Sequence, residues 1–328
     1  MADASDEFGP AGGVSALREE VRREQFLDQM DAVMPWAELV ALVEPHYPKG
    51  EQGRKPVGLE IMLRLYFVQH WFALSDPGAE DALYDSAALR RFVGVDLGRA
   101  PAPDETTILN FRHLLEAHDL CGQMLDTVNL YLASRGIRIT TGTIVDATII
   151  HAPSSTKNEK KERDPEMHQT RKGNQWYFGM KAHIGVDSKE GIVHSVCSTA
   201  ASVSDVHMLP DLLHGGEKKV WGDAGYQGQT EAIRHAAPQA QDMTSKRVKT
   251  KAGVDENQKR KNRTKARVRA KVEWPFRVLK RVFGFTMVRY RGLKKNHEWL
   301  CASFALVNLY QNRKRLAKLN QRLVTQGA

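Results

Sequence analysis

The apolar pattern of the chain changes at about residue 137, and this change constrains the fold more than any other feature. Before it, apolar residues recur every three or four positions, and residues 59–74 (LEIMLRLYFVQHWFAL) are apolar on most faces, which predicts a buried helix. After it, segments rich in Ile, Val and Thr follow one another, and two of them are joined by the hairpin-like sequence DSKEG. The sequence therefore predicts an all-helical region followed by an α/β region.

The elements expected after residue 137 follow the order of a mixed sheet covered by helices. A strand over 137–150 and a hairpin over 177–200 come first, separated by a polar stretch, 151–175, that predicts a long exposed loop. A helix is expected over 203–216, and a short strand ends at Asp223. The chain then predicts a short helix (229–237), a long basic helix and a final amphipathic helix (about 297–322).

Charge is divided unevenly along the chain. Residues 257–328 contain 20 Lys or Arg and 2 Asp or Glu, a net charge of +18. The whole chain is +9, so residues 1–256 carry −9. A solvated basic tail is the simple alternative, but apolar residues separate these charges at helical spacing. The pattern favours a surface that binds a polyanion such as DNA.

Composition excludes several other classes of protein. The three cysteines lie far apart, which argues against a zinc site and disulfides and is typical of a reducing cytoplasm. The N-terminus has no signal-peptide pattern, and no apolar run approaches the ~20 residues that a membrane helix needs. We expect a cytoplasmic protein with no membrane partner.

Three carboxylates occupy unusual sequence contexts. Asp146 interrupts the apolar strand TIVDATII, Asp223 ends the strand VWGD, and Glu273 is the single acid among fifteen Lys or Arg between residues 257 and 297. Each has an ordinary alternative: a buried Asp bonded to a loop, an Asp opening a turn, and a surface counter-charge. Together they make a hard-oxygen set suited to two Mg²⁺ or Mn²⁺ ions, which promote phosphodiester displacement.

These motifs resemble the DDE transposases of bacterial insertion sequences, specifically the insertion-sequence-five family. The resemblance rests on TIVDATIIHAP, VWGDAGYQG and the Arg269-x3-Glu273-x6-Lys280 spacing, and it extends to GLEIMLRLYFVQHWFALSDPGAEDALYDS and PDETTILNFRHLLE near the N-terminus. It implies an RNase H-like fold in which Asp146, Asp223 and Glu273 are the catalytic metal ligands. The family's Tyr position is Ala266 here, and Tyr226 is a candidate replacement.

The residue patterns and the resemblance together predict a domain plan and partners. We expect a disordered N-terminus (1–14), a helical domain (15–136) for DNA-end binding or dimerisation, and a catalytic domain (137–328) with basic C-terminal helices. The DNA partners are terminal inverted repeats and target DNA, bound by a homodimer or larger assembly at the bacterial nucleoid. The expected DNA contacts are Arg269, Lys271, Arg277, Lys280 and Lys294. Trp274 and Trp299 are expected to pack rather than to stack on bases.

Two other functions remain open from the sequence. A nuclease or resolvase with the same fold would cleave DNA without joining it. A DNA-binding protein, or a decayed transposase, would bind element ends without catalysis, although the intact acidic triad argues against this. The leading prediction is cleavage of element ends followed by transfer of their 3′-hydroxyls to target DNA.

Overall fold

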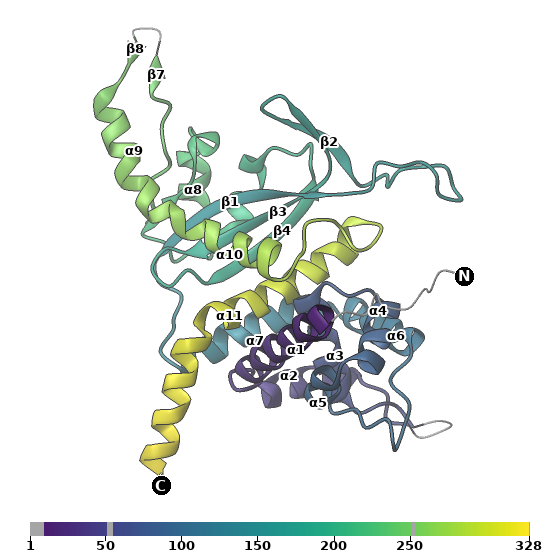
Figure 1. Ribbon diagram of the computed structural model, residues 1–328. Coiled ribbons are helices and arrows are strands. Elements are labelled where there is room, and N and C mark those ends of the chain that lie inside the picture. The colour runs from purple at the N-terminus through teal and green to yellow at the C-terminus, as the bar shows by residue number, and fades with distance from the viewer. Residues whose placement is uncertain (1–9, 51–54, 251–252, 328) are drawn as a thin grey trace.

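The N-terminal part of the chain is entirely helical in the computed structural model, which describes residues 10–50, 55–250 and 253–327 (Figure 1). The part of the expected disordered segment at 1–9 lies outside the described residues, and the first helix begins at Pro10. The helices are α1 (Pro10–Asp31), α2 (Trp36–Val43), α3 (Leu59–Phe72), α4 (Asp76–Asp85), α5 (Ala87–Val93), α6 (Glu105–Ala117) and α7 (Leu120–Ser134), with a short 3₁₀ turn at Glu44–His46.

Local sequence explains where these helices begin. Ser75, Ser86 and Asp104 each accept a hydrogen bond from a backbone N–H of the first turn of α4, α5 and α6, respectively. The continuous apolar run at 59–74 forms α3, which is buried on most of its surface as predicted. The helical N-terminal region is confirmed.

A six-stranded mixed sheet follows. Its strands are β1 (Gly142–His151), β2 (His168–Lys172), β3 (Gln175–Asp187), β4 (Val193–Ala200), β5 (Lys219–Trp221) and β6 (Gln241–Asp242). β1 pairs antiparallel with β3 and parallel with β5, and β5 pairs parallel with β6. β2 and β4 pair with successive halves of β3, along the edge opposite β1. The predicted RNase H-like mixed sheet is confirmed.

Helices cover both faces of this sheet. One face shares a core with the N-terminal helices, and α11 (Leu293–Gly327) packs between β4 and α7 (Figure 1). The other face, which includes Val145 and Val220, packs under α8 (Thr230–Ala236) and Tyr226. Because neighbouring residues of a strand point to opposite faces, Asp146 points to the face that carries Ile144 and the C-terminal helices.

Several segments differ from their predicted conformations, and the strand expected over 137–150 begins only at Gly142. Residues 203–216 form two 3₁₀ turns, Asp205–Met208 and Pro210–Leu212, rather than one helix. Pro210 lacks the N–H that would continue an α-helical ladder, which explains the break. The predicted loop 151–175 ends in β2, because its last residues pair with the extended N-terminal half of β3. Among the described residues, no helix is long and apolar enough to cross a membrane.

The basic helix that carries Glu273 is divided into four pieces. α9 (Glu256–Arg269) leads into a 3₁₀ turn (Ala270–Val272), then α10 (Glu273–Arg277), then a π-helical turn (Val278–Val282). The apolar residues that separate the charges dock this region, since Val272, Phe276 and Leu279 are buried. Pro275 would break a hydrogen bond inside a continuous helix, but α10 begins two residues earlier, so Pro275 falls in a first turn that tolerates it.

Candidate active site

One cavity of about 390 Å³ brings together all three predicted carboxylates. It is lined by residues of β1, of the turn after β5, of β2, and of the segment from the end of α9 through the π-helical turn. Its charged lining residues are Asp146, Asp223, Glu273, Lys172, Arg269, Arg277, Lys280 and Arg281. Acidic and basic side chains from segments far apart in the sequence therefore meet in one cavity.

Asp146 lies on β1 and is half-buried. Its Oδ1 accepts a hydrogen bond from the backbone N–H of Ala147 at 2.8 Å. Burial raises the pKa of Asp146 to about 6, the Ala147 N–H and Arg269 oppose this shift, and the negative charges of Asp223 and Glu273 add to it. The three carboxylates are therefore close enough to interact electrostatically, as the ligands of a shared cation would be.

Asp223 is held by the turn that follows β5. Its Oδ1 accepts a hydrogen bond from the backbone N–H of Gly225 at 2.7 Å and caps the 3₁₀ turn Ala224–Tyr226. A Cβ at position 225 would lie 2.9 Å from that same oxygen, so any larger residue there would displace the carboxylate. The Gly-rich sequence GDAGYQG thus serves to fix the position of Asp223.

Glu273 is exposed at the first residue of α10. Its neighbours Val272 and Phe276 are buried and anchor the start of this helix, so the carboxylate lies at the boundary between core and solvent. The 3₁₀ turn between α9 and α10 interrupts the helix just before Glu273, which lines the cavity.

The structure brings three of the five predicted DNA-binding cations into the cavity: Arg269, Arg277 and Lys280. Lys280 donates hydrogen bonds to Thr148 Oγ1 at 2.7 Å and to the Ile149 carbonyl at 2.8 Å, which ties the π-helical turn to β1. Burial, and secondarily Lys172, lowers the pKa of Lys280.

The other two predicted cations lie outside the cavity. Lys271 donates to the backbone carbonyls of Ser188 and Lys189, and Lys294 forms an ion pair with Asp119. Sequence reasoning missed Lys172 and Arg281, which do line it. Lys172 lies in the segment read as a loop, and only the pairing of β2 with β3 brings it to the site. Nothing in the sequence sets Lys172 apart from the other cations of that stretch, such as Arg171 and Lys160.

Three aromatic residues singled out in the sequence have distinct environments. Trp299 is buried and stacks on His70 with ring centroids 3.6 Å apart, so its predicted packing role is confirmed. Trp274 is 50% exposed beside Arg277, so its predicted packing role is wrong: the side chain follows Glu273 on the solvent side of α10. The Tyr226 hydroxyl is buried beneath the sheet, where DNA has no access to it.

No group of three or more His, Cys, Asp or Glu residues in the described ranges is already arranged tightly enough to hold a metal ion. The donor chemistry of the cavity nevertheless suits a divalent ion, because carboxylate oxygens are the ligands that Mg²⁺ and Mn²⁺ prefer. The raised pKa of Asp146 points the same way, since a buried anion needs a cation nearby.

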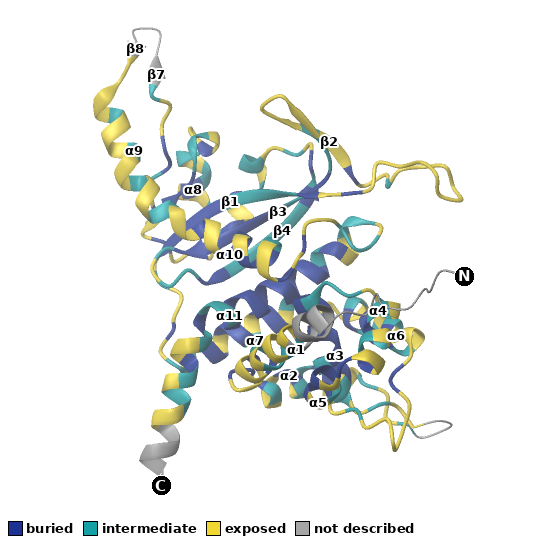
Figure 2. Ribbon diagram, in the orientation of Figure 1, coloured by how far each residue is buried: buried dark blue, intermediate teal, exposed yellow. Residues whose placement is uncertain are grey.

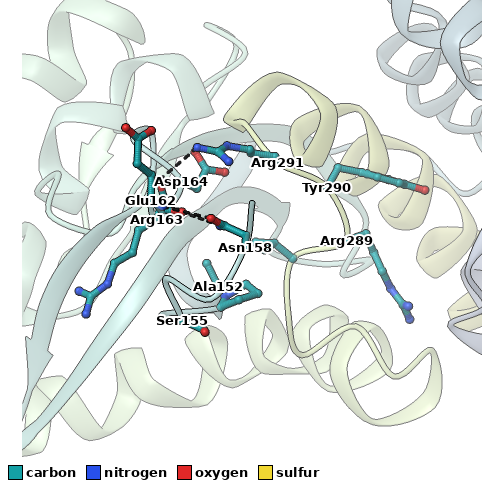
Figure 3. Close-up of a pocket in the computed structure, with 11 residues that line it drawn as sticks. Ala152, Ser155, Asn158, Glu162, Arg163, Asp164, Arg289, Tyr290 and Arg291 are labelled. Atoms are coloured by element: carbon teal, nitrogen blue, oxygen red, sulfur yellow. Dashed lines mark hydrogen bonds between the residues drawn. The ribbon is translucent and has the colours of Figure 1, made fainter. Parts of the chain in front are cut away.

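A second cavity, of about 220 Å³, lies between the loop after β1 and the segment before α11 (Figure 3). Its polar groups are engaged within the protein: the Asp164 carboxylate accepts from the Gly292 N–H at 2.7 Å, and Arg291 donates to the Arg163 carbonyl at 3.3 Å. The Asn158 side chain donates to the Glu162 carbonyl at 2.6 Å. The hydrogen bonds around this cavity attach the loop after β1 to the start of α11.

The RNase H-like sheet carries acids and bases together in one cavity, a combination suited to a polyanionic substrate and a divalent cation. Comparison with protein families gives the particular class: a transposase DDE domain matches residues 138–309, more than half of the chain, and a second transposase domain (DUF772) matches residues 15–114. The chain belongs to the DDE transposases, the enzymes that move mobile DNA elements. The narrower insertion-sequence-five assignment stays a prediction.

One solved structure with a similar arrangement is the piggyBac transposase, determined by cryo-electron microscopy in a synaptic complex with hairpin DNA. The match covers 93% of this chain and 81% of that one, with 10% sequence identity and a TM-score of 0.39. The family matches, rather than this distant likeness, establish the class of the protein.

Proposed function

We propose that this transposase cleaves the ends of its own insertion sequence and joins the freed 3′-hydroxyls to target DNA. The observation that carries the proposal is the meeting of Asp146, Asp223 and Glu273, from three separate elements, in one cavity rimmed by cations. Asp146, Asp223 and Glu273 would hold two Mg²⁺ or Mn²⁺ ions. Such ions, when bound, activate the attacking oxygen and stabilise the leaving oxygen of a phosphodiester.

The cations that line the cavity have separate roles in binding DNA and in holding the site together. Arg269, Arg277 and Arg281 offer guanidinium groups that bind phosphate oxygens and hold the DNA backbone over the acids. Lys280 is already bonded to β1, so it keeps the π-helical turn, and with it Arg281, close to Asp146. A purely acidic cavity would repel DNA, and a purely basic one would bind it without cutting it.

Partners and location follow from the same proposal. The helical domain (15–136) binds the terminal inverted repeats or mediates dimerisation, and two ends require at least two chains, because each chain has one triad. The protein acts on DNA at the bacterial nucleoid.

Cleavage of the element ends can be tested directly by incubating purified protein with Mg²⁺ and a plasmid that carries the gene with its chromosomal flanks. New 3′-ends at the element boundaries are expected, and their absence would contradict the proposal.

Asp146→Asn should stabilise the metal-free protein at neutral pH. The pKa of Asp146 is about 6 in the folded chain and about 3.9 in an unfolded one. The folded state therefore holds the proton more tightly, and stability falls as pH rises from about 4 to about 6. This pKa difference corresponds to at most about 3 kcal/mol in the free energy of unfolding. In EDTA at pH 7.5, the variant should have the higher melting temperature.

The same measurement at pH 4 is the control for Asp146→Asn. The folded wild type is then protonated at this position and its unfolded chain is about half protonated, so the two melting temperatures should nearly agree. Mg²⁺ should raise the melting temperature of the wild type more than that of the variant, because ligand binding to the folded state stabilises it. Equal melting at pH 7.5 would show that the buried charge is not a source of instability.

A further inference from the structure

Helix α9 differs from an ordinary surface helix in how little of its side-chain surface is buried. Such helices bury an apolar stripe, but none of the fourteen residues of α9 is buried. Figure 2 shows it exposed along nearly its whole length, and Figure 1 shows that it leads from the β7–β8 tip (Lys249–Thr250 and Gly253–Val254) down to α10. Packing against the core therefore does not explain this helix.

Polar contacts hold one side of α9. Asn262 exchanges two hydrogen bonds with the backbone of Lys246, at 3.3 and 2.6 Å, and Lys265 donates to the Thr244 carbonyl at 2.7 Å. Gln258 donates to Asn262 at 2.7 Å. These anchors are spaced four and three residues apart, so they form one row along the helix. Arg269 continues this row and ends in the active-site cavity.

A row of arginines lies on the opposite side of α9. Arg260, Arg263 and Arg267 are spaced three and four residues apart, at about 180° from the anchor row when each residue turns the helix by about 100°. All three are exposed. Arg260 reaches Asn257 at 3.2 Å, whereas Arg263 and Arg267 make no hydrogen bond or ion pair with any residue in the described ranges.

This arrangement of charge is unfavourable in the absence of a partner. Arg263 and Arg267 are like charges four residues apart, which destabilises a helix. Burial lowers the pKa of Lys265, and the neighbouring charges of Lys246 and Lys261 lower it further, against the opposing effect of Asp242. A polyanion that follows the helix would remove this repulsion.

We propose that α9 is a second DNA-binding surface, which follows the duplex leading away from the scissile phosphate. The inference rests on the proposed function, because Arg269 links α9 to the cavity where that phosphate would be cut. Fourteen helical residues span roughly 21 Å, which corresponds to roughly six base pairs at about 3.4 Å each. The arginine row therefore contacts phosphates within about six base pairs of the cleavage point.

The test compares two double variants of the full-length protein. Arg263→Gln/Arg267→Gln removes two charges from α9 and keeps good helix formers. Lys314→Gln/Lys318→Gln removes two exposed charges from the far part of α11 and is the matched control. On a 30-base-pair duplex, the α9 variant should lower the slope of log K against log salt by about two. The control should leave the slope unchanged.

A second readout locates the contact. Ethylation interference on cleaved element ends should show that wild-type protein depends on phosphates within about six base pairs of the cut, and that the α9 variant has lost this dependence. If both double variants change the slope equally, or if the α9 variant changes only the self-association of the protein, α9 is not a DNA surface. Wild-type cleavage in Mg²⁺ is scored separately, so failure of the proposed function would be recognised independently.

Discussion

Asp146→Asn, Asp223→Asn and Glu273→Gln should each lower the rate of end cleavage in Mg²⁺ by at least about 10³-fold, which corresponds to about 4 kcal/mol of transition-state stabilisation. Each change removes one negative oxygen from a single set of ligands and preserves the shape of the side chain. DNA affinity should remain or rise slightly, because the cations that line the cavity are unchanged. Cleavage rates at saturating DNA, together with separate binding isotherms, check both parts.

Glu231→Gln is a suitable control for these three variants. Glu231 is an exposed carboxylate in the first turn of α8, on the other face of the sheet. Its neutralisation changes the net charge by the same amount without altering the cavity, so cleavage should stay within twofold, or about 0.4 kcal/mol, of the wild type. A triad variant that cuts within tenfold of the wild type would mean that the residue concerned is not a ligand.

Pre-cleaved ends with a free 3′-hydroxyl should be joined to a target plasmid by the wild type, and not detectably by Glu273→Gln. The same three carboxylates would serve both reactions, because cleavage and joining are each displacements at phosphorus. Gel analysis of labelled ends in Mg²⁺ measures the joined product. This experiment separates a transposase from a nuclease of the same fold, which would cut intact ends and leave pre-cleaved ends unjoined.

Mixing wild-type and Glu273→Gln chains tests whether joining requires an assembly of two or more copies. If two ends are joined by two chains that associate at random, an equal mixture of wild type and Glu273→Gln should give about one quarter of the two-ended product. Independent chains would give about one half. A Glu231→Gln mixture should match the undiluted wild type. A linear response to the inactive chain would contradict a synaptic assembly of two or more copies.

The sequence determined the two features that local chemistry controls. The change from helical to strand periodicity at about residue 137 marks the observed boundary between α7 and β1, because side-chain burial follows the repeat of each element. The three carboxylates were identifiable because an acid in a buried strand, or alone among bases, is costly without a partner.

Only the tertiary structure decided which cations accompany those acids. Lys280 reaches Thr148, 132 residues away, and Lys172 reaches the cavity because β2 pairs with β3. Lys271 belongs to the same basic stretch, yet it is bound to a loop carbonyl outside the site. These outcomes depend on long-range pairing and on the breaks between α9, α10 and the π-helical turn, which rotate successive residues differently. A uniform 3.6-residue repeat, which is all that the sequence offers, cannot specify them.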